Sequence, residues 1–253
     1  MITRTSPASL GLLLLLSACG DPPAKAAPTP ETKTPAEPEA KADPAPQAEA
    51  EPEPGQTNAH ARTWTFDDAV AGQIPAGFRI TETGGAGTPA TWEVVADPSA
   101  PTQPNAFGIT KTDNGKGTFN LALVEGTRYG DVDISVMVKS GTGELDRGGG
   151  PVWRVQSESD YYIARWNPLE NNARFYIVQG GVRTALAKVD LELDPEAWHS
   201  MRVVTEGPRM ELFIDDQPVL TTNDSALAEP GMIGLWTKAD AATLFDDLSV
   251  AEP

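Results

Sequence analysis

The sequence predicts an all-β protein: a jelly-roll β-sandwich of two antiparallel sheets over residues 61–253. From Arg62 onward, short runs of alternating apolar and polar residues are separated by glycine, proline, asparagine and aspartate. This two-residue period is typical of half-buried strands. We find no convincing helical pattern longer than a turn or two. About thirteen strands, with a turn every 8 to 12 residues or so, suit a sandwich in one domain.

The clearest strand is expected over Asp131–Lys139, where Val132, Ile134, Val136 and Val138 share one face. Three hairpins follow it, each with a short polar or glycine-rich turn. They pair 151–156 with 161–166, 172–178 with 182–189, and 198–205 with 210–214. Two further strands are expected at 232–237 and 243–250.

Residues 1–18 are expected to be a signal peptide. Arg4 precedes the apolar run Leu10–Leu16, which is too short to span a membrane. The segment Leu16-Ser17-Ala18-Cys19 resembles the lipobox of bacterial lipoproteins, and this resemblance implies lipidation of Cys19, the only cysteine. The protein is then anchored in the bacterial cell envelope. Gly20 follows the cysteine, and the absence of an aspartate there favours the outer membrane.

Residues 19–60 are expected to form a disordered tether. Between Asp21 and Gly55 lie ten of the 23 prolines, and most other positions are alanine or glutamate. No aromatic residue occurs before Trp64. Such a segment buries too little apolar surface to offset its ordering entropy. A proline-rich chain of this length extends over on the order of 100 Å, so we interpret it as a spacer between membrane and domain.

A family resemblance covers Trp64 to Val250. Its motifs are Gly148–Arg154, Asp160–Arg165, Asn167–Asn172, Trp198-His199, Glu206–Arg209 and Gly234–Asp240 followed by Phe245–Leu248. Together they resemble the concanavalin A-like lectin/glucanase superfamily, in its 3-keto-disaccharide hydrolase domain family. The resemblance implies two curved antiparallel sheets whose concave face often holds carbohydrate. Activity does not follow from such a likeness, because one fold hosts many functions.

The strongest enzyme motif is Glu192-Leu-Asp194-Pro-Glu196, which matches the E-x-D-x-E string of retaining glucanases in that superfamily. Their chemistry needs the carboxylates on one face of an unbroken strand. Pro195 interrupts a strand, and a connecting loop is expected here. His199 is the sole candidate base in the fold, since His60 lies in the tether. We therefore assign no catalytic residue, and Glu192, Asp194 and Glu196 remain the candidates.

A polar and aromatic group is the better candidate site. If residues 157–160 form a four-residue turn, then Arg154 lies opposite Ile163. The side chains of Arg154, Gln156, Tyr161 and Arg165 then share one face of adjacent strands. In the strand expected at 232–237, Gly234 and Trp236 point away from Ile233 and Leu235. Aromatic faces and convergent polar groups are typical of sugar sites, although core packing and structural ion pairs explain the same residues. The ligand-binding candidates are Arg154, Gln156, Tyr161, Arg165, Asn167, Asn172, Arg174, Tyr176, Trp236, Lys238 and Asp240.

Metals and partners are constrained more loosely. The repeated Phe-Asp-Asp segments carry Asp67, Asp68, Asp246 and Asp247 near the two ends of the domain, and carboxylates suit a structural calcium ion. Turn and capping roles explain them as well, and no other cofactor is implied. From Ala61 onward, the sequence contains 15 Lys and Arg and 28 Asp and Glu. This excess of negative charge opposes nucleic-acid binding.

Three functions follow from these observations. The first is a membrane-anchored, lectin-like carbohydrate-binding domain without its own catalysis. The second is a glycoside hydrolase or 3-keto-glycoside-cleaving enzyme, and the third is an envelope scaffold that binds a protein partner. Loss of binding on replacing Trp236 or Arg165 would favour the first, and loss of turnover on replacing Glu192 would favour the second.

Overall fold

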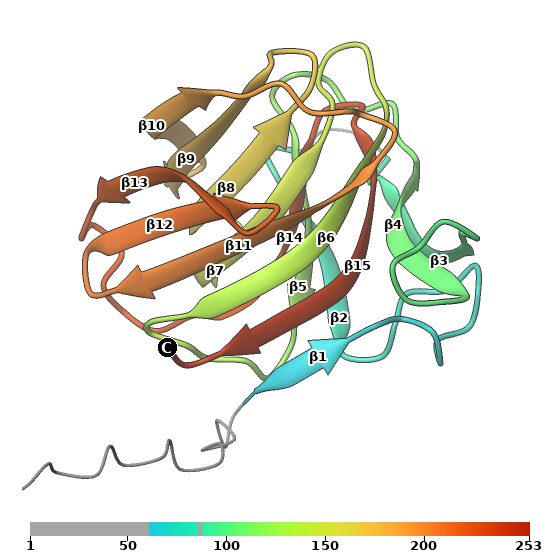
Figure 1. The fold of residues 1–253 in the computed structure, drawn as a ribbon, viewed down its shortest axis with the longest axis horizontal. Helices are drawn as coiled ribbons and strands as arrows, with labels where there is room; N and C mark the ends of the chain where they lie inside the picture. The colour runs from blue at the N-terminus through green and yellow to red at the C-terminus, as the bar shows by residue number, and fades with distance from the viewer. Residues whose placement is uncertain (1–60, 86–87) are drawn as a thin grey trace, which may run out of the picture. The chain divides into compact units, whose positions relative to one another are not determined.

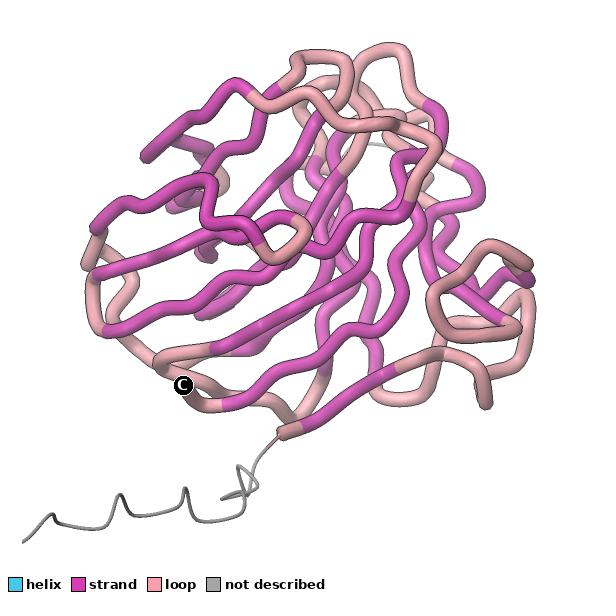
Figure 2. The backbone as a smooth tube through the Cα atoms, in the orientation of Figure 1, coloured by secondary structure: helices cyan, strands magenta, loops and turns pink. Residues whose placement is uncertain are grey.

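The computed structural model describes residues 61–85 and 88–253, which fold into fifteen strands (Figure 1). Strands and loops make up the whole described part, and it contains no helix (Figure 2). It therefore contains no helix long and apolar enough to cross a membrane. The expected signal peptide at 1–18, the lipidation of Cys19 and the tether at 19–60 lie outside the described residues.

One sheet has eight strands in the order β13-β12-β11-β6-β15-β4-β3, and β1 pairs with β15 in addition. All the pairings are antiparallel. The strands are β1 (Arg62–Trp64), β3 (Thr91–Ala96), β4 (Asn105–Lys111), β6 (Asp133–Thr142), β11 (Trp198–Glu206), β12 (Arg209–Ile214), β13 (Gln217–Asn223) and β15 (Ala242–Ala251).

The other sheet has seven strands in the order β10-β9-β8-β7-β14-β5-β2, again antiparallel throughout. Its strands are β2 (Phe78–Thr83), β5 (Phe119–Val124), β7 (Gly149–Ser157), β8 (Asp160–Asn167), β9 (Asn172–Gln179), β10 (Val182–Asp190) and β14 (Met232–Lys238). This is the two-sheet jelly-roll sandwich that the alternating pattern predicts.

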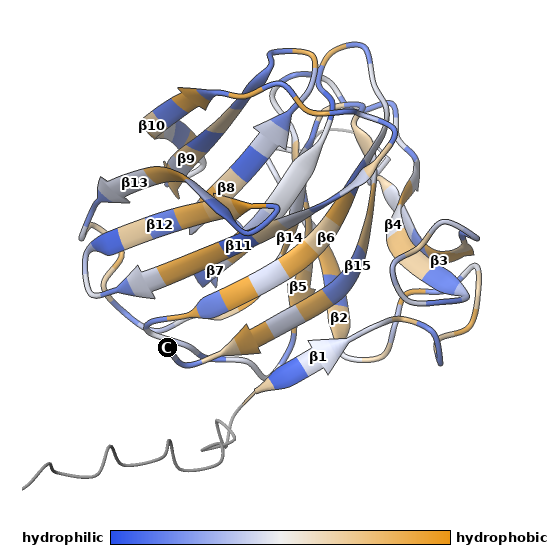
Figure 3. Cartoon of the chain, viewed as in Figure 1, coloured by the Kyte–Doolittle hydropathy of each residue, from blue (hydrophilic) through white to orange (hydrophobic). Residues whose placement is uncertain are grey.

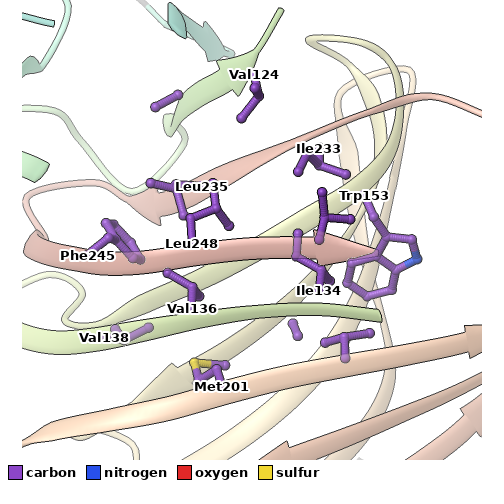
Figure 4. Packing of buried hydrophobic residues seen from close by; sticks show 14 of the residues in the cluster. Val124, Ile134, Val136, Val138, Trp153, Met201, Ile233, Leu235, Phe245 and Leu248 are labelled. Carbon is purple, nitrogen blue, oxygen red and sulfur yellow. The ribbon is translucent and has the colours of Figure 1, made fainter. Parts of the chain in front are cut away.

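The main core lies between the two sheets. Alternate side chains of β6 and β15 point into it, and Figure 3 shows the resulting bands of apolar and polar residues along these strands. Figure 4 shows Val136 and Phe245 from one sheet packing near Leu235 from the other. Burying this apolar surface is the main favourable term for the fold, and no disulfide can assist it because the chain has a single cysteine.

The three predicted hairpins are confirmed as β7–β8, β9–β10 and β11–β12, and the two last strands as β14 and β15. Val132, Ile134, Val136 and Val138 are all fully buried, as the alternation predicts. The strands before residue 131 and β13 carry weaker alternation. Phe119–Val124, for example, is buried at every position, and a strand covered on both faces has no polar period to recognise.

The two Phe-Asp-Asp segments lie near paired strands, since Trp64 of β1 pairs with Leu248 of β15. Their carboxylates hold the loop before β4. Asp67 accepts a hydrogen bond from the backbone N–H of Asn105 (3.2 Å). The fully buried Asp246 accepts one from the N–H of Thr102 (2.9 Å). Among the described residues, no group of three or more Asp, Glu, His or Cys is placed to hold a metal ion; calcium binding here stays a prediction.

The pKa of Asp246 should make stability depend on pH. Burial raises this pKa from 3.8 to about 6, against the opposing hydrogen bonds from Thr102. The folded state therefore binds the proton more tightly than the unfolded state. The stability that Asp246 contributes is complete below pH 3.8 and is lost as the pH rises through about 6. The shift corresponds to at most about 3 kcal/mol.

We predict that Asp246→Asn, which cannot ionise, removes this dependence. Relative to the wild type, its free energy of unfolding should rise between pH 4 and pH 7 by up to about 3 kcal/mol. Urea unfolding of both proteins at the two pH values measures the change. An equal difference between the two proteins at both pH values would contradict it.

Candidate functional site

A second apolar layer covers the face of the seven-stranded sheet that points away from the main core. Its members come from five adjacent strands and are almost fully buried. They are Phe119, Leu121, Leu123, Val152, Val155, Tyr161, Ile163, Tyr176, Val178 and Trp236. Both faces of this sheet are therefore packed, whereas an antiparallel sheet commonly has one packed face and one face in solvent.

Contacts between strands that are not neighbours indicate that this sheet is strongly curved. The hydroxyl of Thr83, at the end of β2, lies 2.7 Å from the Tyr161 hydroxyl of β8, and β5, β14 and β7 separate these strands. The same Thr83 hydroxyl donates to the backbone carbonyl of Glu158 in the β7–β8 turn. Burial raises the pKa of Tyr161 to about 12. The second apolar layer thus lies on the concave face.

Arg183 of β10 extends over this layer. Its Cζ lies 4.3 Å from the ring centroid of Tyr176, 5.1 Å from that of Phe119 and 5.6 Å from that of Trp236. Cations are attracted to aromatic faces at such distances. The guanidinium therefore joins edge strand β10 to β5 and β14 across the concave face, and it covers the aromatic rings beneath it.

The carboxylate of Asp146 is the centre of a polar network at one end of the concave face. Its side chain is 1% exposed. It accepts hydrogen bonds from Lys238 Nζ (2.8 Å), Asn167 Nδ2 (2.8 Å) and the backbone N–H of Arg147 (3.0 Å). Arg165 Nη1 lies 3.7 Å away. A buried carboxylate is tolerated only with such partners.

Arg165 continues the network to a more exposed edge. Its side chain is 1% exposed, and its Nη2 donates to Glu170 Oε2 (2.8 Å) and to Asn172 Oδ1 (3.1 Å). Arg174 Nε donates to the same Asn172 oxygen (3.1 Å), and Arg174 Nη2 lies 3.4 Å from Glu170. The Glu170 side chain is 45% exposed, so this edge offers a carboxylate and a guanidinium to solvent.

Electrostatics keep Glu170 charged. Burial alone would raise its pKa, but the hydrogen bond and charge of Arg165, with help from Asn172 and Arg174, lower it to about 2. Glu170 is therefore ionised throughout the physiological range and acts as a hydrogen-bond acceptor only.

The carboxylate of Asp240 is held by backbone N–H groups. Its carboxylate accepts backbone N–H groups from Glu144, Leu145 and Asp146 at 2.8 to 3.1 Å. Burial would raise the pKa of Asp240, but these hydrogen bonds outweigh it and lower the pKa. Asp240 thus fixes the loop that carries Asp146 beside Lys238.

The predicted register of the β7–β8 hairpin is wrong beyond the turn. Ser157 pairs with Asp160, but Val152 and not Arg154 lies opposite Ile163. A bulge separates the two parts of the ladder, with Arg154 at φ 47°, a left-handed conformation that is uncommon outside glycine. Sequence alternation cannot count the extra residues of a bulge.

Because of this bulge, Arg154 leaves the predicted group. Its guanidinium donates to Asp131 (2.8 Å) and to the carbonyls of Gly130, Leu227 and Gly207. Gln156 is exposed and donates to the carbonyls of Glu229 and Pro230. Both side chains tie the bulge to neighbouring loops, away from the Asp146 network.

The remaining predicted residues do lie together, in two layers. Arg165, Asn167, Asn172, Arg174, Lys238 and Asp240 form the polar network or adjoin it. Tyr161, Tyr176 and Trp236 form part of the apolar layer, and Trp236 points away from Ile233 and Leu235 as predicted. Trp236 is 0% exposed. The indole that was expected to contact a sugar is therefore covered, and Arg183, which was not among the predicted site residues, lies over it.

The catalytic candidates lie outside the concave face's strands. Glu192, Asp194 and Glu196 occupy the loop between β10 and β11, as expected from Pro195. Glu196 pairs with Arg147 (3.0 Å). The string therefore does not present three carboxylates along one strand, which retaining glucanases require.

His199 is held on both sides. Its Nδ1 lies 2.7 Å from Asp215 Oδ2 and its Nε2 lies 2.8 Å from the carbonyl oxygen of Asp194. The ring is buried and meets Trp166 edge to face. With both nitrogens engaged, His199 has the contacts of a structural histidine.

The fold is a two-sheet jelly-roll sandwich, which also occurs in a carbohydrate-binding module. The carbohydrate-binding module CBM66 from Bacillus subtilis superposes with a TM-score of 0.54 at 17% identity, over 70% of this chain and 96% of that module. The cellulose-induced protein Cip1 superposes with a TM-score of 0.57 at 13% identity, over 76% and 97% of the two chains. At these identities the likeness shows a shared fold.

A relative by sequence is the levanase of Bacillus subtilis (strain 168). It is 24% identical over 137 residues, which make up 52% of this chain and 19% of the levanase. The match thus covers less than a fifth of that enzyme. No protein-family model matches the chain.

We predict that Asp146→Asn is strongly destabilising. It removes the charge that pairs with buried Arg165 and with Lys238, whose side chain is 13% exposed, and breaking such a buried pair costs about 3–5 kcal/mol. The matched control is Asp190→Asn, because Asp190 and its partner Lys188 are 82% and 46% exposed; loss of this surface pair should cost about 1 kcal/mol or less. Urea unfolding at pH 7 compares the two, and equal losses would contradict the assignment.

Proposed function

We propose that this protein is a carbohydrate-binding domain, and that the sugar docks at the edge of the concave face formed by Glu170 and Arg174. The single observation that carries this proposal is the partly exposed carboxylate–guanidinium pair of Glu170 and Arg174, which hydrogen bonds and ion pairs with Arg165 and Asn172 hold in place. The shared fold with a carbohydrate-binding module supports it.

The chemistry of this edge suits vicinal sugar hydroxyls. A hydroxyl both donates and accepts, so one can donate to Glu170 while its neighbour accepts from Arg174. Both side chains are held before a ligand arrives, and binding then costs little further side-chain entropy. Leu169, half-exposed beside Glu170, adds apolar surface for the C–H face of a sugar ring.

Binding of the purified full-length protein to a glycan array, with levan included because of the levanase relative, is the first test. We predict that Glu170→Gln and Arg174→Met each weaken a hit by about tenfold or more, because hydrogen bonds to charged groups contribute about 1.5–3 kcal/mol. Glu206→Gln, an exposed carboxylate on the eight-stranded sheet, should leave affinity unchanged.

Two outcomes would count against the proposal. Silence on every glycan would favour the scaffold that binds a protein partner. Release of product from a bound glycan would favour an enzyme, as the resemblance to the 3-keto-disaccharide hydrolase domain family implies. In that case Glu192→Gln, Asp194→Asn and Glu196→Gln would be examined for loss of turnover.

We further propose that residues 61–253 form the binding domain, that 19–60 form a spacer, and that lipidated Cys19 anchors both in the cell envelope after removal of 1–18. The lipobox resemblance at Leu16–Cys19 and the proline-rich composition support this arrangement. The membrane in which we expect this anchor is the outer membrane.

Anchoring predicts a specific effect of Cys19→Ser. Expressed in a Gram-negative host fed with a labelled fatty acid, the wild type should incorporate label and sediment with membranes, since acyl chains supply the attachment. The variant should incorporate none. Label in the variant equal to that in the wild type would contradict lipidation at this residue.

A further inference from the structure

We propose that the carbohydrate site selects sugars that carry a negative charge, a uronate carboxylate or a sulfate ester, and that Arg183 is the residue that recognises this charge. The inference rests on the proposed function and specifies its ligand class. It starts from one cation that lacks a counterion.

The charged groups on the concave face are unequal in number. Around the polar network the cations are Arg165, Arg174, Arg183 and Lys238, and the carboxylates are Asp146, Glu170 and Asp240. Lys188 and Asp190 of β10, in register with Arg174 and Asn172, pair with each other (2.6 Å) and leave this difference unchanged. Each carboxylate is already engaged by a cation or by backbone N–H groups. This local positive excess contrasts with the surplus of carboxylates in residues 61–253 as a whole.

Arg183 is the cation that forms no ion pair with these carboxylates. Within the described part of the chain it has no ion pair, and its buried Nη1 has no hydrogen-bond partner. Its contacts are the rings of Tyr176, Phe119 and Trp236. Aromatic faces attract the charge but accept no strong hydrogen bond from its N–H groups. The donors that match a carboxylate or sulfate therefore remain free.

Arg165 provides a second positive charge close by. Its Cζ lies 5.7 Å from the ring centroid of Tyr176, the ring that Arg183 approaches to 4.3 Å. Arg165 Nε is also buried without a partner. Burial lowers the pKa of Arg183, and the charge of Arg165 also lowers it, while Tyr176, Asp146 and Glu170 raise it without reversing the shift. An anion beside Arg183 would relieve both effects, because it supplies acceptors and opposite charge in a partly desolvated place.

The position of Arg183 links it to the proposed sugar edge. It shares Tyr176 with Arg165, and Arg165 donates directly to Glu170. A sugar whose hydroxyls reach Glu170 and Arg174 thus lies on the same face as the free guanidinium. Because carboxylates outnumber cations in the rest of the domain, its net charge does not attract acidic glycans. Any preference for them must therefore come from the cations of this site.

The test compares pairs of ligands that share a sugar backbone and differ in whether it carries the charged group. Oligogalacturonides are paired with their methyl esters, and dextran sulfate oligosaccharides with unmodified dextran oligosaccharides. Calorimetric titration of the full-length wild type should show at least about tenfold tighter binding of one charged member than of its neutral partner. The preferred pair identifies carboxylate or sulfate as the recognised group.

Arg183→Gln should reduce the affinity for the charged member by about tenfold or more, and should reduce the affinity for its neutral partner by a much smaller factor, so that the preference for charge is lost. Arg183→Lys should retain part of the preference, because it keeps the charge and loses the planar fork. Arg209→Gln, an exposed cation on the eight-stranded sheet, is the matched control and should change neither affinity. Near-UV circular dichroism monitors the aromatic layer in each variant.

The outcomes separate the two proposals. Binding of neutral and charged members with equal affinity, or a preference that survives Arg183→Gln, would overturn this inference and leave the carbohydrate-binding domain standing. Failure of every glycan, charged or neutral, would overturn both.

Discussion

Asp146 places a carboxylate where water cannot reach it, and the arrangement of the concave face follows from the partners that this charge requires. A buried carboxylate without partners would cost several kcal/mol. Lys238 from β14 and Asn167 from β8 meet that requirement directly, while Asp240 fixes the loop that carries Asp146. Three segments that are distant in sequence are thereby held at fixed positions.

The same requirement extends outward to the exposed edge. Arg165 lies within 3.7 Å of Asp146 and also donates to Glu170 and Asn172. The exposed groups of the network are thus fixed by groups that are more deeply buried. Glu170 and Arg174, although partly in solvent, are positioned by side chains that have almost no freedom to move. Preorganisation of this kind is what a site for a polar ligand needs.

The sequence predicted the fold well because burial imposes a two-residue period. The valines of β6 alternate cleanly, and their strand and its facing direction follow at once. Phe119–Val124 has no such alternation, because β5 is covered on both faces. Both faces of β5 are buried because the sheet is curved. Curvature depends on all the strands of the sheet, so the local sequence of one strand does not predict it.

The candidate site was predicted in part for the same reason. Arg165, Asn172 and Arg174 alternate with apolar neighbours, so their common face could be read from spacing. Arg154 could not be excluded from that face, because a bulge in β7 changes the count of residues without changing their type. Arg183 looks like any cation of an exposed edge strand. Its role depends on the curvature that brings β10 toward β5 and β14.

This curvature also explains why the aromatic layer supports a cation. Phe119, Tyr176 and Trp236 could not stay exposed side by side without a large apolar patch facing water. The stem and guanidinium of Arg183 cover them, as long cationic side chains do when their apolar part lies on a hydrophobic surface. The rings hold the guanidinium by attraction to its charge, yet they leave its N–H donors unmatched. The contact between Arg183 and these rings therefore has two results. It covers the apolar concave face, and it leaves N–H donors of the guanidinium available to an anionic group.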